Sequence, residues 1–276
     1  MTVELSFDGK FELTEDDADI LIQISGGAIL WQKERLLNVA MKSVPPNVDS
    51  IAWLDCDVIF ERPNWVDEAK RQLKNINVIQ LFSDVVDLEQ MDCEICVGHR
   101  DVPVSAQGIV SLMSRTELNA KAIFTQPRSV ATRRWGTGLA WAARREILES
   151  HGLYDAMIAG AGDKARVFAM YGQFQPLIDL NRFNSARREH FLNWAHPYHQ
   201  AIGNRIGHIA GRLYHLWHGT ILNRNYDGRH QGVIDCNFNP YTDIMIRPNG
   251  AWQWARPMPD LEKFFIDFFV GRREDG

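Results

Sequence analysis

Apolar and polar residues alternate along the first third of the chain in a pattern that predicts strands separated by helices. Short apolar runs bounded by turn residues predict buried strands, and apolar residues at helical spacing predict helices. The predicted order is a strand at 3–7, a strand at 19–24, a helix at 29–44 that Pro45-Pro46 ends, a strand at 50–60, a surface helix at 64–75 and a strand at 76–82. This alternation favours an α/β fold with a parallel sheet.

The later part of the chain contains glycine turns followed by helical patterns. Residues 135–155 predict a glycine turn and a helix that begins near Ala140 and ends at Gly152, and residues 160–172 predict a second glycine-rich turn with its helix. Residues 208–219 predict a hairpin, or a strand that ends in a turn. An apolar stripe on residues 261–269 predicts a helix that packs on the core. Because there is no repeat or low-complexity linker, we expect one domain over residues 1–276.

Composition narrows the function classes. A net charge of −5 provides no electrostatic footprint for nucleic acid. The chain has neither a signal-peptide pattern nor a run of 18 apolar residues, so no transmembrane segment and a cytoplasmic location are expected. Its four cysteines do not make a disulfide framework; Cys93 and Cys96 form a lone CxxC, and Cys56 is expected to pack inward.

Two acids directly follow the apolar run of residues 51–54. Asp55 and Asp57 suit a hard divalent cation that also binds phosphate oxygens, because two buried carboxylates without a cation resist ionisation together. The alternative is that one acid caps the turn and the other faces water. In open α/β sheets ligands bind beyond the carboxyl ends of the strands, where these acids are expected.

Two histidines three residues apart form a second candidate element. His215 and His218 precede Gly219, and a tight turn there would bring both imidazoles to one ion such as Mn, Zn or Fe. The alternative is one buried and one surface histidine. His196 and His199 repeat this spacing around Pro197, but Trp194 and Tyr198 beside them are typical of packing.

One more carboxylate and several cations complete the candidates. Asp163 opens a predicted helix, where it either caps the helix or orients and deprotonates a hydroxyl. Lys33 and Arg35, and also Arg224 and Arg229, are cations that fit a phosphate site or a solvated surface.

The order of these pieces resembles the GT-A glycosyltransferases, in particular the β-1,4-galactosyltransferase group and its bacterial relatives. The matching segments are QKERLLNVAM, IAWLDCDVIF, GTGLAWAARREIL and HLWH, which extend the likeness from about residue 3 to residue 218. The resemblance implies a GT-A fold with a mixed, mostly parallel sheet flanked by helices. Residues 1–100 would form the nucleotide half, and residues 101–276 would bind the acceptor and complete the metal site.

The resemblance also implies roles for single residues. The metal ligands would be Asp57, His215 and His218, with Mn²⁺ as the ion and Mg²⁺ as the alternative. A nucleotide-diphosphate sugar, with UDP as the favoured nucleotide, would bind against Asp55, Lys33, Arg35 and Gly138. Asp163 would hold the hydroxyl of a glycan acceptor and act as the base, which implies inversion. Trp135 or Trp217 would be candidates for stacking on a sugar.

Three departures from the family pattern matter. Lys164 follows Asp163 where the family has a further acid, which puts the identity of the base in question. His215 replaces a methionine that the family places at this metal position. The chain also starts after the family's first strand, so we expect that strand and its uridine contacts to be missing. Two alternatives to a transferase therefore stay open, namely a catalytically weak sugar-nucleotide binding module and a sugar nucleotidyltransferase.

Overall fold

The computed structural model describes residues 1–89, 102–115, 120–125, 135–220, 223–225 and 228–273. The helices are η1 (Glu15–Asp17), α1 (Lys33–Lys42), α2 (Trp65–Leu73), α3 (Ile109–Arg115), α4 (Ala120–Thr125), α5 (Arg145–His151), α6 (Gly162–Met170), α7 (Phe174–Leu180), α8 (Ser185–Ile202), α9 (Gln231–Asp235) and α10 (Pro259–Gly271). The strands are β1 (Thr2–Ser6), β2 (Leu21–Ser25), β3 (Ser50–Leu54), β4 (Val58–Phe60), β5 (Val78–Gln80), β6 (Asp84–Asp87), β7 (Ala106–Gly108), β8 (Trp135–Gly136), β9 (Ala140–Arg144), β10 (Ile206–His208), β11 (Arg212–His215), β12 (Ile244–Ile246) and β13 (Trp252–Trp254).

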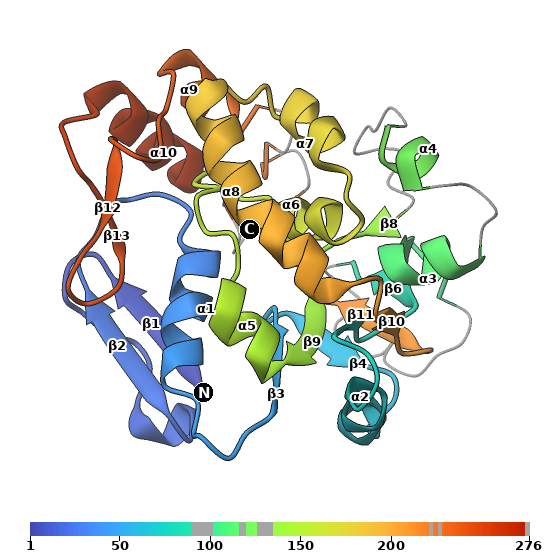
Figure 1. Cartoon of the computed structure of the whole chain (residues 1–276). Coiled ribbons are helices and arrows are strands. Elements are labelled where there is room, and N and C mark those ends of the chain that lie inside the picture. Colours follow the sequence, from blue (N-terminus) through green and yellow to red (C-terminus); the bar gives the residue numbers. More distant parts are fainter. Residues whose placement is uncertain (90–101, 116–119, 126–134, 221–222, 226–227, 274–276) are drawn as a thin grey trace.

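The strands form mixed sheets flanked by helices, which places the chain in the α/β class. One sheet has the order β10-β5-β9-β3 and a second has the order β4-β11-β6-β7-β8. The pairs β1-β2 and β12-β13 lie together on the opposite side of the molecule from β10 and β11 (Figure 1). Four of the nine pairings within the described ranges are parallel and five are antiparallel, so the predicted mostly parallel sheet is wrong.

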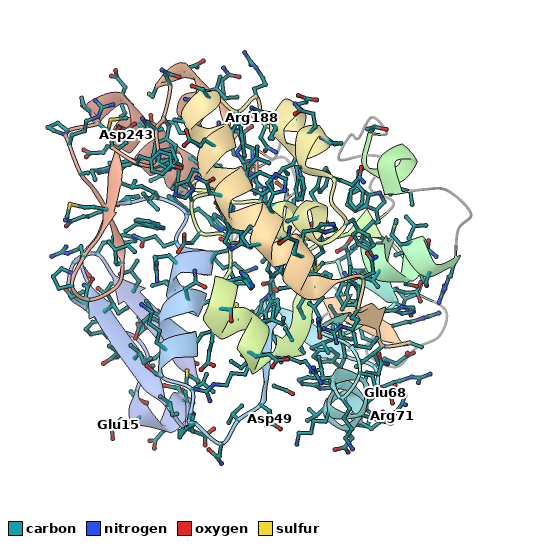
Figure 2. All side chains as sticks on the ribbon, viewed as in Figure 1. Glu15, Asp49, Glu68, Arg71, Arg188 and Asp243 are labelled. Carbon is teal, nitrogen blue, oxygen red and sulfur yellow. The ribbon has the colours of Figure 1, made fainter. Side chains whose placement is uncertain are left out.

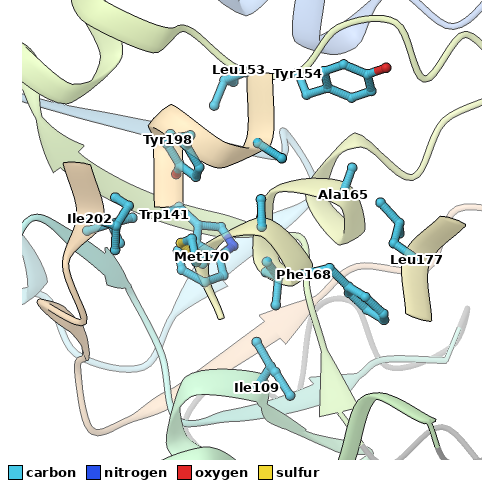
Figure 3. Close-up of a cluster of buried hydrophobic side chains, with 14 of the residues drawn as sticks. Ile109, Trp141, Leu153, Tyr154, Ala165, Phe168, Met170, Leu177, Tyr198 and Ile202 are labelled. Atoms are coloured by element: carbon cyan, nitrogen blue, oxygen red, sulfur yellow. The ribbon is translucent and has the colours of Figure 1, made fainter. Parts of the chain in front are cut away.

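The largest core cluster lies where α6 and α8 cover the sheet that contains β9. Figure 3 shows Trp141 of β9 among Phe168 and Met170 of α6 and Tyr198 of α8. Residues 165–170 of α6 are all buried, as expected of a helix that is enclosed on every side. A second cluster packs α10 through Leu261, Phe265 and Phe268, which confirms the predicted core-facing stripe.

Several predicted elements are confirmed with shorter bounds. The helices predicted at 29–44 and 64–75 form as α1 and α2, and Glu68 and Arg71 pair on the surface of α2 at 2.5 Å (Figure 2). Residues 208–219 contain strand β11 at 212–215, followed by an irregular segment with a bend at Gly219; the predicted strand is confirmed in part. No helix in the described part of the chain is long and apolar enough to cross a membrane.

Two predicted elements are wrong in an informative way. The segment from Ala140 is strand β9, and the helix begins only at Arg145. A short apolar run that is buried on both faces has no period that distinguishes a strand from a helix. The strand predicted at 50–60 is two strands in different sheets, because the Asp55–Asp57 turn separates β3 from β4.

Candidate metal centre

The turn that carries the two acids connects the two larger sheets. Backbone hydrogen bonds hold it on both sides: the Asp55 amide donates to the Leu139 carbonyl at 2.7 Å, and the Leu216 amide donates to the Asp57 carbonyl at 2.8 Å. Asp55 is thus tied to the glycine turn before β9, and Asp57 to the segment that follows β11. The two carboxylates belong to different clusters for this reason.

Asp57, His215 and His218 converge on one point. Asp57 Oδ2 lies 3.4 Å from His215 Nε2 and 3.1 Å from His218 Nε2, and the two Nε2 atoms lie 3.2 Å apart. His215 is buried, whereas about a quarter of the His218 and Asp57 side chains remains exposed. The predicted shared site for the two imidazoles is supported by this convergence, with His218 in the irregular segment that follows β11.

The strand register explains why these residues meet. β11 lies between β4 and β6, and His215 is aligned with Val58 on one side and with Asp87 on the other. Asp87 Oδ1 lies 2.8 Å from His215 Nδ1. A carboxylate on the second ring nitrogen fixes the orientation of a metal-binding histidine and leaves Nε2 for the ion. Asp87 was missed by the sequence analysis, although an acid at the end of an apolar strand is a signal of the kind that Asp55 and Asp57 provide.

Opposite charges in the centre shift the pKa values of His215 and Asp57 so that each charged form is stabilised. Burial alone would lower the pKa of His215, but the hydrogen bonds and charges of Asp57 and Asp87 outweigh it and raise this pKa to about 9. Burial alone would raise the pKa of Asp57, but the hydrogen bond from His215 and the charges of both histidines lower it. Arg224 Nη2 lies 3.4 Å from the carbonyl oxygens of His218 and Gly219.

The three ligand atoms fit a divalent transition metal. Ligands that share an ion at about 2.1 Å and about 90–110° lie roughly 3.0–3.4 Å apart, and the three measured separations fall in this range. Asp57 Oδ1 is buried and has no hydrogen-bond partner among the described residues. Two imidazoles with one carboxylate suit Mn, Fe or Zn better than Mg or Ca.

A second cluster joins Lys33, Asp55 and Asp163 beside this centre. Lys33 Nζ lies 2.5 Å from Asp55 Oδ1 and 3.3 Å from Asp163 Oδ2, and each of the three side chains is about one quarter exposed. Gly138 lies against both acids, because a Cβ atom there would be 3.0 Å from Asp163 Oδ2 and 3.9 Å from Asp55 Oδ2. The structure therefore brings together three of the four residues predicted to bind the donor.

Two further buried residues lie beside this cluster, and the sequence analysis missed both. Arg166 is 1% exposed, its guanidinium lies 4.7 Å and 4.1 Å from the ring centres of Trp53 and Trp141, and its Nη2 is 3.4 Å from Asp163 Oδ1. Glu34 is buried against the start of α6, where a Cβ atom at Gly162 would be 2.3 Å from its carboxyl group.

Burial and neighbouring charges shift the pKa values of these three acids in different directions. Burial alone would raise the pKa of Asp163, but Lys33 and Arg166 outweigh it and lower this pKa. Burial raises the pKa of Glu34 to about 7, and the charge of Asp163 adds to this shift. Burial also raises the pKa of Asp55, despite Lys33. Asp163 is thus the acid of this cluster whose pKa is lowered.

Other candidates lie elsewhere or have structural roles. Arg35 is not brought to the cluster: it pairs with Asp155 at 2.9 Å and lies over Trp252, so the expected donor contact is not present. Asp163 is in the first turn of α6 and is not its N-cap, which is Ala161. Cys56 is exposed, so the expectation that it packs inward is wrong.

The remaining candidates are two tryptophans, an arginine, a histidine and two cysteines. Trp135 is buried and packs edge-on against Phe124. Trp217 is half-buried in the segment that carries His218. Arg229 is buried beside Gly160, and His196 is exposed on α8. Cys93 and Cys96 lie outside the described residues.

Comparisons with protein-family models, curated proteins and solved structures find no match to this chain.

Proposed function

We propose that this chain is a metal-dependent, inverting glycosyltransferase of the GT-A type. It would move a sugar from a nucleotide-diphosphate donor, with UDP as the favoured nucleotide, to a hydroxyl of a glycan acceptor. The proposal rests on one observation. A single turn between two sheets places Asp57 with His215 and His218, and Asp55 with Lys33 and Asp163.

The metal centre supports binding of a diphosphate. Asp57, His215 and His218 would hold Mn²⁺, with Mg²⁺ as the alternative ion. A divalent ion at this position supplies positive charge to the leaving diphosphate. The protein supports the same ligands with Asp87, which orients His215, and with the backbone bond from Leu216 to Asp57.

The neighbouring cluster supports binding and orientation of the sugar and the acceptor. Gly138 lies against Asp55 and Asp163 and leaves open the space that a side chain would take. Asp163 is held ionised by Lys33 and Arg166, so its remaining lone pairs accept a hydrogen bond from a hydroxyl. In this proposal it orients the acceptor hydroxyl and takes its proton.

The test is release of nucleotide diphosphate from a panel of nucleotide sugars, with Mn²⁺, with Mg²⁺ or with EDTA. We expect release from one donor, dependent on the metal, and its loss in Asp57→Asn and His218→Ala. His196→Ala is the matched control, because it removes an exposed histidine of the same sequence spacing from α8. Equal activity of His218→Ala and His196→Ala would refute the assignment of the metal ligands. A lack of release from every donor, with and without glycan acceptors, would refute the proposed reaction.

A further inference from the structure

An apolar groove leads from the surface to Lys33. It has a volume of about 560 Å³ and lies between the end of β1, the segment before α1, and the outer face of α10. Its apolar wall includes Leu5, Phe7, Trp31, Leu36, Ile266 and Val270. This volume is typical of pockets for small molecules.

Gln32 and Lys33 carry the amide and the charged side chain of the groove wall, and both are engaged. Gln32 is buried; its Oε1 accepts from the Trp252 amide at 2.7 Å, and its Nε2 donates to the Ala28 carbonyl at 2.9 Å. Lys33 lines the groove, and its Nζ lies within 3.3 Å of both Asp55 and Asp163. The groove and the carboxylate cluster therefore share one side chain. A further polar side-chain atom of the wall is the buried indole Nε1 of Trp31, which has no hydrogen-bond partner among the described residues.

The outer end of the groove exposes large apolar side chains. Val270 is 75% exposed, Phe7 48% and Ile266 45%. Adjacent exposed apolar residues of this size mark a surface that binds something apolar. Lys33, the cation of the groove wall, is already paired with the carboxylates of Asp55 and Asp163, so its charge is compensated and does not favour an anionic head group.

We propose that this groove binds the hydrocarbon part of an uncharged amphiphilic acceptor, whose hydroxyl-bearing head lies at Lys33 and Asp163. The role of acceptor rests on the proposed glycosyl transfer, whereas binding of the hydrocarbon does not. The apolar wall binds the hydrocarbon chain of the ligand. The carboxylate cluster binds a neutral head group that donates hydrogen bonds to carboxylates. The acceptor is thus a glycolipid-like molecule, and a free oligosaccharide would leave the groove empty.

The test is calorimetric titration of the full chain with hexyl and octyl β-D-glucoside below their micelle concentrations. Each added methylene that is buried contributes about 0.8 kcal/mol, or about fourfold, so octyl glucoside should bind about fifteenfold more tightly than hexyl glucoside. Val270→Glu and Ile266→Glu change exposed residues of α10 and should abolish this dependence on chain length. Leu180→Glu, at a residue of α7 that is 51% exposed, is the matched control and should retain it.

Three outcomes separate this inference from the proposed function. Equal affinity for the two glucosides would refute hydrocarbon binding in the groove. The same conclusion would follow if Leu180→Glu lost the dependence of affinity on hydrocarbon length as much as Val270→Glu does. A dimer in sedimentation equilibrium that Val270→Glu dissociates, without glucoside binding, would assign the groove to a second copy and also refute it. Glucoside binding that depends on hydrocarbon length, without nucleotide release from any donor, would support hydrocarbon binding in the groove and refute glycosyl transfer.

Discussion

Replacement of Glu34 by glutamine tests the electrostatics beneath the candidate site. Glu34 is 5% exposed and lies in the first turn of α1 against Gly162. Burial, and then the charge of Asp163, raise its pKa from 4.5 to about 7. Glutamine has nearly the same shape and no charge, so Glu34→Gln removes this titration and leaves the packing in place.

The sign and size of the effect follow from the two pKa values. Between pH 4.5 and about 7 the folded chain binds more protons at Glu34 than the unfolded chain does, so the stability of the wild type falls as the pH rises through this window. From about pH 5 to about pH 8 this loss amounts to about 2.5 kcal/mol. Glu34→Gln lacks it, and its free energy of unfolding relative to the wild type should rise by that amount.

Urea unfolding near pH 5 and near pH 8, followed by tryptophan fluorescence, measures this difference. Any offset of the variant that does not depend on pH cancels between the two conditions. Glu15→Gln is the control, since Glu15 is an exposed acid of η1 (Figure 2). A difference between Glu34→Gln and the wild type that is constant with pH would refute the buried, proton-binding state of Glu34.

Three further substitutions test the supports of the site. Asp87→Asn removes the charge that orients His215 and should weaken Mn²⁺ binding about 10- to 100-fold in a Mn²⁺ titration, whereas unchanged affinity would contradict this role. Gly138→Ala places a methyl group 3.0 Å from Asp163 Oδ2 and should lower the rate of nucleotide release at unchanged Mn²⁺ affinity; an unchanged rate would contradict the assigned close approach. Arg166→Met removes one of the two cations paired with the partly exposed carboxylate of Asp163 and should lower the free energy of unfolding by about 1–3 kcal/mol, whereas an unchanged free energy in urea unfolding would contradict the pairing.

The parts of the site that the sequence predicts are those set by local spacing. The sequence spacing predicts that His215 and His218 share a site, and their Nε2 atoms lie 3.2 Å apart. The same reasoning assigns Asp55 and Asp57 to one ion, whereas the structure places them in different clusters, as the family resemblance implies. Asp57 meets the histidines because β4 and β11 pair. That Asp57 and the two histidines lie near one another was expected from two arguments: ligand sites in open α/β sheets lie at strand ends, and the family resemblance implies a shared metal site.

The rest depends on register and burial, which local patterns do not encode. Asp87 reaches His215 only because β6 and β11 are neighbours in a particular alignment. An arginine in a helix is typically a surface cation, yet α6 is enclosed, and the Arg166 guanidinium lies over the indole rings of Trp53 and Trp141. Arg35 reads as a partner of Lys33, but two positions along α1 it faces Asp155. The sequence predicts a helix from Ala140, but residues 140–144 form strand β9, because a short alanine-rich run has no distinctive period.

Titration of the chain with Mn²⁺, followed by electron paramagnetic resonance of the free ion, tests the central claim most directly. We predict one site in the wild type, retention of that site in His196→Ala, and its loss in His218→Ala. Circular dichroism of each variant confirms that the fold is intact. Binding of Mn²⁺ by His218→Ala with the affinity of the wild type would contradict the metal centre.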